Sequence, residues 1–155
     1  MSTNVKLLHK IADRIEADPA HFDLGFFAAP AKRVDVSREP DYPTSVYERV
    51  VKDEPVPTCG TVACIAGWAI IESDPKLRRR KRITEDDLWK SAEERGLGYG
   101  MARPAAKLLG LDCYDIFYDE NWKERRAGRP TAANVAKQLR LLAKGKGKFA
   151  DHYVE

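Results

Sequence analysis

The sequence predicts a mainly α protein, folded as a compact single-domain helical bundle around one buried central helix. Its 155 residues are a usual size for one domain with its own core. Apolar residues recur at helical spacing in several segments, and proline, glycine or capping residues separate these segments. One long uncharged run lies at about residues 58–71. As a helix it would carry apolar or small residues on nearly every face, which is typical of a buried helix.

The first predicted element is an amphipathic helix over residues 4–17. Its apolar stripe consists of Val5, Leu8, Ile11, Ala12 and Ile15. Ser2, Thr3 or Asn4 would cap its N-terminus. Pro19 would end it, because the residue before a proline avoids helical backbone angles.

Residues 28–57 contain five prolines, which disfavour long helices and strands. The valines of this segment could form two short strands, and residues 45–51 could instead form a helical turn. We therefore expect a long proline-rich loop with room for a small β element.

The central helix is predicted over residues 58–71. Its small face would consist of Gly60, Ala63, Cys64 and Gly67. Thr58 or Thr61 would serve as its N-cap. A buried strand is the alternative, but the run is long for a strand and poor in β-branched residues.

The second half of the chain predicts four further helical segments, at residues 84–95, 105–109, 113–118 and 132–143. Thr84 followed three residues later by Asp87 resembles a capping box. Gly110 is suited to end the segment before it in a left-handed conformation. The globular domain would end at residue 148, and residues 149–155 would form a loose tail.

Composition excludes several classes of protein. The longest uncharged run, residues 56–71, is shorter than the roughly 20 residues of a membrane span. No apolar segment typical of a secretion signal follows Met1, and three cysteines are an odd number for a disulfide framework. We therefore expect a cytoplasmic protein with free thiols. No second Cys/His pair follows Cys59 and Cys64 at zinc-finger spacing, so no metal and no cofactor is expected.

Two clusters of cations are the main binding candidates. The first consists of Lys76, Arg78, Arg79, Arg80, Lys81 and Arg82. The second contains Arg125, Arg126 and Arg129. Such blocks could neutralise the phosphates of a nucleic acid or meet an acidic protein, but a solvated loop is the simpler interpretation of a charge block.

One site for thiol chemistry is a candidate. Cys59 stands near the predicted N-terminus of the central helix, where a thiol is activated, and His21 or His152 could act as its base. Gly60, Thr61 and Trp122 would line a pocket beside it. The simpler interpretation is a partly buried, unreactive cysteine.

Residues 59–68 read Cys-Gly-Thr-Val-Ala-Cys-Ile-Ala-Gly-Trp. With this motif the chain resembles a family of small uncharacterised bacterial and phage proteins. The resemblance implies a bacterial or phage origin and supplies no activity. The proline-rich segment 30–57 and the basic run 76–82 depart from the pattern of that family.

The sequence therefore predicts a non-catalytic accessory protein that binds a macromolecular partner through its basic patches. A nucleic-acid binder that uses residues 76–82 and the basic C-terminal segment is one alternative. A cysteine-dependent enzyme that uses Cys59 is the other. The oligomeric state stays open.

Overall fold

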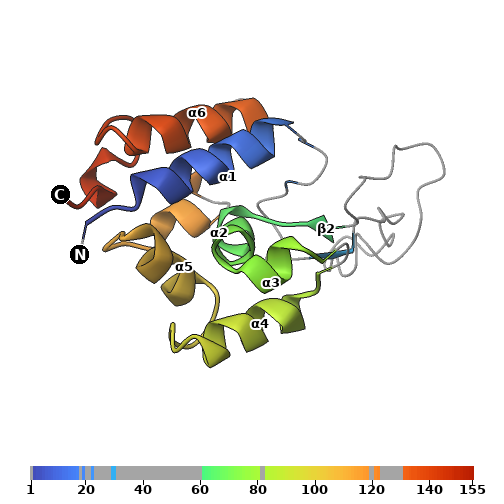
Figure 1. Ribbon diagram of the computed structural model, residues 1–155. Coiled ribbons are helices and arrows are strands. Elements are labelled where there is room, and N and C mark those ends of the chain that lie inside the picture. Colours follow the sequence, from blue (N-terminus) through green and yellow to red (C-terminus); the bar gives the residue numbers. More distant parts are fainter. Residues whose placement is uncertain are drawn as a thin grey trace, which may run out of the picture.

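A computed structural model describes residues 2–17, 19, 22, 29–30, 61–80, 83–118, 121–122 and 131–155. This part of the chain is mainly helical, as predicted (Figure 1). Its α-helices are α1 (Val5–Ala17), α2 (Ile65–Ser73), α3 (Pro75–Arg78), α4 (Glu85–Glu94), α5 (Ala102–Leu109) and α6 (Ala132–Leu142). Two short 3-10 helices, η2 (Asp115–Phe117) and η4 (Ala150–His152), follow α5 and α6.

Helix α2 lies at the centre of the fold, as the uncharged run predicted. It is seen end-on in the middle of Figure 1, with α1, α3, α4 and α5 around it. Residues 65–71 are all buried. Because every side of this helix meets another element, its sequence can be apolar all round without exposing a hydrophobic face.

The predicted start of the central helix was wrong. Strand β2 (Thr61–Val62) precedes the helix and pairs antiparallel with β1 (Ala29–Pro30). The backbone remains extended at Cys64, whose Sγ accepts a hydrogen bond from the Gly67 N–H at 3.5 Å. Cys64 is therefore the N-cap in place of Thr58 or Thr61, because residues 61–62 before it pair as a strand. The periodicity of the sequence does not reveal this pairing.

Helices α1 and α6 run antiparallel along one side of α2 (Figure 1). The buried face of α1 consists of Leu7, Leu8, Ile11, Ala12 and Ile15. The predicted stripe differs by one residue, since Val5 is 36% exposed and Leu7 takes its place in the core. The stripe shifts because α1 is covered by α6 as well as by α2 and α5, which widens its buried face.

Three other predicted caps are confirmed. Of the three candidates before α1, Asn4 is the cap, and its Oδ1 accepts from the Leu7 N–H at 3.1 Å. Thr84 and Asp87 form the predicted capping box of α4. Gly110 ends α5 with a left-handed φ of 65°. The predicted segment 113–118 is shorter than expected, since only η2 within it is helical.

Residues 149–155 were expected to form a loose tail, but they pack onto the domain. Phe149 and His152 are each 5% exposed. The Thr3 N–H donates to the Val154 carbonyl at 2.8 Å, and the Val154 N–H donates to Thr3 Oγ1 at 2.7 Å. The two termini therefore lie side by side (Figure 1). None of the described helices has both the length and the apolar character needed to span a membrane.

Candidate basic groove between α1 and α3

The first half of the basic run forms α3, a helix that the sequence analysis did not expect. Asp74 ends α2, and its Oδ1 accepts from the Lys76 N–H at 2.9 Å, so it also caps α3. Pro75 occupies the first turn, where a proline is favoured. Leu77 is buried and anchors the helix, while the lysine and arginines around it remain exposed.

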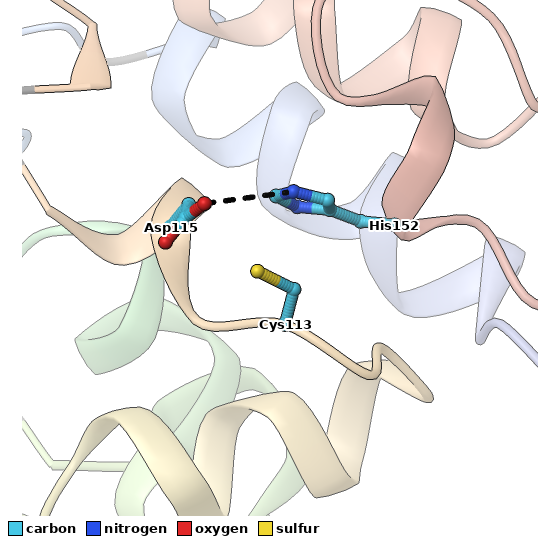
Figure 2. Close-up of side chains that lie close together, drawn as sticks. All are labelled: Cys113, Asp115 and His152. Carbon is cyan, nitrogen blue, oxygen red and sulfur yellow. Dashed lines mark ion pairs between the residues drawn. The ribbon is translucent and has the colours of Figure 1, made fainter.

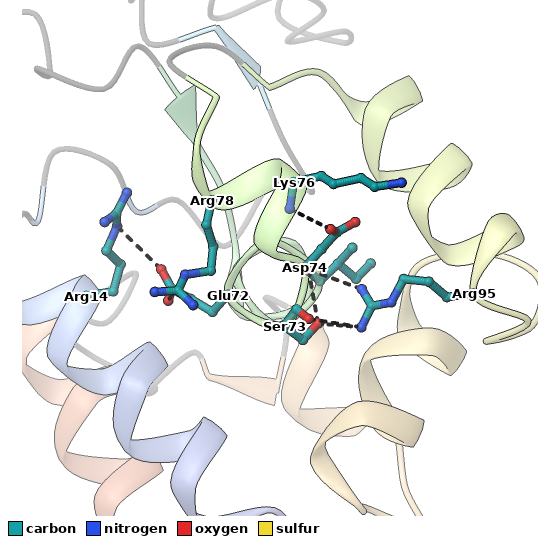
Figure 3. A network of polar contacts seen from close by, with 8 residues as sticks. Arg14, Glu72, Ser73, Asp74, Lys76, Arg78 and Arg95 are labelled. Atoms are coloured by element: carbon teal, nitrogen blue, oxygen red, sulfur yellow. Dashed lines mark hydrogen bonds and ion pairs between the residues drawn. The ribbon is translucent and has the colours of Figure 1, made fainter.

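The orientation of α3 depends on the carboxylate of Asp74. Ser91 Oγ of α4 donates to Asp74 Oδ2 at 2.6 Å. Arg95 donates to Ser73 Oγ at 2.9 Å (Figure 3). Burial alone raises the pKa of Asp74, but the hydrogen bonds from Ser91 and the Lys76 N–H and the charge of Arg95 outweigh it. The net effect lowers the pKa, so the carboxylate stays ionised and joins α2, α3 and α4.

Helix α1 contributes a second row of cations. Lys6, Lys10 and Arg14 follow one another at four-residue steps, which places them about 6 Å apart along one side of the helix. Lys6 and Lys10 line a cavity of about 280 Å³ together with Arg78. This row therefore faces α3, although the two segments are far apart in the sequence.

A second cavity, of about 340 Å³, continues the first. Arg14 lines it together with Arg78, Arg79 and Arg80, and Trp68 and Ile71 contribute apolar surface. The two cavities share Glu72, Pro75 and Arg78, so they form one continuous depression. We call this depression the basic groove. Its described cations are Lys6, Lys10, Arg14, Arg78, Arg79 and Arg80.

Glu72 is the only acidic residue among the described residues that line the basic groove. Its side chain is 13% exposed, and its carboxylate lies 3.9 Å from Arg14 Nε and 3.9 Å from Arg78 Nε. Figure 3 shows Arg14 of α1 and Arg78 of α3 beside it. Glu72 thereby holds two guanidinium groups close together while neutralising one charge of the six.

Arg14 is the most constrained of these cations. Its guanidinium lies 4.8 Å from the ring centroid of Trp68, a cation–π contact that orients it. Its Nε atom is buried and makes no hydrogen bond within the described part of the chain. An acceptor oxygen of a ligand in the groove would satisfy this N–H group.

The remaining cations differ in how far they are already neutralised. Arg80 lies 2.7 Å from Asp87. Burial raises the pKa of Asp87, but the Thr84 N–H and the Arg80 guanidinium outweigh this effect and lower it, which keeps that pair charged. Lys6, Lys10 and Arg79 make no ion pair among the residues that the structure describes. They are the cations most available to a partner.

The structure places only part of the predicted site residues. Cys59, Gly60, His21, Lys81, Arg82, Arg125, Arg126 and Arg129 lie outside the described residues. Thr61 belongs to β2. Trp122 is buried, its Nε1 donates to the Ile116 carbonyl at 2.8 Å, and it lines neither cavity of the basic groove.

The sequence analysis missed the three cations of α1. Their four-residue spacing was visible in the sequence and indicated one helix face, but helix faces rich in lysine and arginine are usually only solvated. What the sequence did not reveal is that α1 packs beside the corner between α2 and α3. That packing turns two separate charge clusters into one groove.

No protein-family model matches this chain, and the searches for similar curated proteins and solved structures give no significant match either.

Proposed function

We propose that this protein is a non-catalytic accessory protein that binds the acidic surface of a macromolecular partner in the basic groove. The proposal includes a bacterial or phage origin and a cytoplasmic location, which follow from the sequence resemblance and from composition. The observation that supports it best is the convergence of six cations, from α1, from α3 and from the two residues after α3, around one acidic residue.

Three features of the groove favour binding over a merely solvated surface. Asp74 and Leu77 hold α3 in place, so the backbone that carries Arg78 and the arginines after it needs little ordering when a partner binds. Glu72 and Trp68 orient Arg14 in advance. Lys6, Lys10 and Arg79 have no ion-pair partner in the described part of the chain, and such charges attract an acidic partner over a Debye length of about 8–10 Å.

A nucleic-acid partner is the second candidate, and one observation favours it. The cations of α1 recur regularly, at steps of about 6 Å along the helix. A regular row suits a backbone of repeating phosphates, and contacts with phosphates alone would give binding without sequence preference. The same groove would serve in this case, so the experiment must compare both kinds of ligand.

The test uses three fluorescent probes: polyglutamate, a short duplex DNA and a single-stranded DNA. For the proposed acidic protein partner we expect wild-type protein to bind polyglutamate at low salt. The double substitution Lys10→Glu/Arg79→Glu should weaken this binding at least about tenfold, because it reverses two unneutralised charges of the groove. Both side chains are exposed, so the variant should fold normally.

A matched control reverses two exposed cations elsewhere, Lys90→Glu on α4 and Lys137→Glu on α6. It changes the net charge equally and should leave binding nearly unchanged. Equal loss in both variants would mean that net charge, and not the groove, governs binding. Binding of DNA without binding of polyglutamate, with affinity falling steeply with salt, would replace the acidic-protein proposal by the nucleic-acid one. No binding of any probe at low salt would refute both.

A further inference from the structure

A second group of reactive side chains lies away from the basic groove. Cys113 lies just before η2, and Asp115 is the first residue of η2. Figure 2 shows both beside His152 of η4. One ligand atom of each residue can be chosen such that all three lie within 4.8 Å of one another. The fold brings these residues together when the C-terminal segment docks.

His152 is the least ordinary member of this cluster. It is 5% exposed, and its Nδ1 atom is buried without a hydrogen-bond partner in the described part of the chain. Its Nε2 atom faces two carboxylates, Asp151 at 3.7 Å and Asp115 at 4.0 Å. Buried polar atoms normally have partners, so His152 is not a fully satisfied core histidine.

The imidazole is held firmly in this position. Its ring centroid lies 5.4 Å from that of Phe149, which in turn packs at 4.8 Å against Trp122. The backbone N–H of His152 donates to the Phe149 carbonyl at 2.9 Å, which fixes the backbone from which the ring projects. A ligand to His152 would therefore meet a ring whose orientation is already set.

The donor set has a definite preference among metal ions. A thiolate, an imidazole and a carboxylate together suit zinc and chemically similar divalent transition metals, while magnesium and calcium prefer oxygen alone. Bond lengths of about 2.0–2.3 Å to zinc place neighbouring ligand atoms roughly 3.3–3.8 Å apart in a tetrahedron. The distances between the three ligand atoms must therefore shorten by about 1 Å when the ion binds.

Two of the three side chains are free to supply this contraction. The side chain of Asp115 is 61% exposed, and Cys113 is only half-buried and carries a free thiol. Nε2 is the nitrogen of His152 that lies near the other ligands, 4.0 Å from Asp115 Oδ2. Asp151 lies 3.7 Å from the same nitrogen, so its carboxylate is within reach of an ion bound there.

We propose that Cys113, Asp115 and His152 bind a divalent transition-metal ion of the zinc type, with water or Asp151 as the fourth ligand. The ion joins the turn before η2 to the C-terminal segment. Because Val154 is hydrogen-bonded to Thr3, the ion also strengthens the closure of the two termini. Binding requires a deprotonated thiol and a neutral imidazole, so it weakens as the pH falls.

The experiment titrates the metal-free, full-length chain with Co²⁺ and then with Zn²⁺. We expect one equivalent of Co²⁺ to produce a thiolate-to-cobalt charge-transfer absorption, and Zn²⁺ to displace it. Zn²⁺ should also raise the melting temperature in a concentration-dependent manner. Cys113→Ser should abolish the charge-transfer absorption, and Asp115→Asn should weaken Zn²⁺ binding at least about tenfold.

Both substituted side chains are at least partly exposed, so these variants should fold, which circular dichroism would verify. Cys59→Ser and the exposed neighbour Asp112→Asn serve as controls and should behave as wild type. Absence of the absorption in wild-type protein, or its persistence in Cys113→Ser, would overturn the proposal. His152 would then be a buried histidine paired only with Asp115 and Asp151. The Lys10→Glu/Arg79→Glu variant should retain metal binding, which keeps this test independent of the proposed function.

Discussion

Gly110 and Gly96 have the same left-handed backbone, with φ of 65°, but different surroundings. A Cβ atom at Gly96 would meet no atom within 4 Å. A Cβ atom at Gly110 would overlap the Ser2 carbonyl oxygen and lie 2.8 Å from the carbonyl carbon. Gly110 thus serves both to end α5 and to let the N-terminal segment pass close to it.

Substitution of each glycine by alanine should separate these two roles. Gly96→Ala should lower the free energy of unfolding by about 1–2 kcal/mol, the cost of a left-handed conformation for a residue with a Cβ atom. Gly110→Ala should cost about 1–3 kcal/mol more, because backbone atoms of the N-terminal segment must move. Urea unfolding of both variants measures the difference. Equal costs would show that the N-terminal segment does not need this close approach.

At the scale of elements, Asp74 decides how three helices meet. It ends α2, caps α3 and accepts a hydrogen bond from Ser91 of α4. Helix α3 has four residues and α2 has nine, and helices of such lengths are not stable in isolation. Their position therefore depends on packing and on this carboxylate, and the arginines of the basic groove depend on α3.

Asp74→Ala should lower the free energy of unfolding at neutral pH by about 1–3 kcal/mol, since it removes a cap and leaves Ser91 without its partner. The folded state lowers the pKa of Asp74 below its ordinary value of 3.8. The contribution of the ionised carboxylate is therefore fully present above the unfolded pKa and is lost as the pH falls through the folded pKa. Denaturant unfolding at neutral and acidic pH should show the wild-type advantage shrinking below pH 3.8.

A suitable control is Glu93→Ala on the exposed side of α4, which should change stability by less than about 0.5 kcal/mol. The free energies of unfolding of wild type and Asp74→Ala could instead differ by the same amount at all pH values. The stabilisation by Asp74 would then not depend on its charge.

At the scale of the whole molecule, the closure of the termini completes the core. Phe149 and His152 are buried, and Val154 forms two hydrogen bonds with Thr3. Thr3 Oγ1 in turn donates to the Gly110 carbonyl at 3.2 Å. The first residues, the end of α5 and the C-terminal segment thus meet at one place.

A chain that ends at residue 148 should be destabilised by at least about 3 kcal/mol, because loss of Phe149 alone removes a buried aromatic side chain. For a domain of this size, each kcal/mol lowers the melting temperature by about 2–4 °C. Thermal unfolding followed by circular dichroism measures the effect. Removal of the exposed Glu155 alone should have almost none. An unchanged melting temperature after removal of residues 149–155 would restore the loose tail expected from the sequence.

Much of the helical content was predictable from local patterns. The spacing of apolar residues located α1, α4 and α6, and the pair Thr84 and Asp87 identified a capping box before α4. These features depend on neighbours three or four residues away, so the sequence contains them directly. The prediction that α2 is buried succeeded for a related reason, since an uncharged stretch of that length has no polar side to present to water.

The predictions that are wrong depend on contacts between distant segments. The predicted start of α2 is wrong because β2 pairs with β1. The prediction of a loose tail is wrong because the lysines and glycines at residues 144–148 give no sign that Phe149 and His152 are buried after them. The basic run was visible as charge, but its partner row on α1 was not. Cys113, Asp115 and His152 carried no spacing that indicated a metal site.

The sequence by itself determined the fold class, the central apolar helix and most of the capping residues, because these follow from periodicity and local hydrogen bonding. Only the tertiary structure decided which charges and which ligands meet. Lys10 and Arg79 line the same groove because α1 packs beside α3. Cys113 lies near His152 because the C-terminal segment packs onto the domain. Such encounters are set by burial of the whole core, a property that no short stretch of sequence contains.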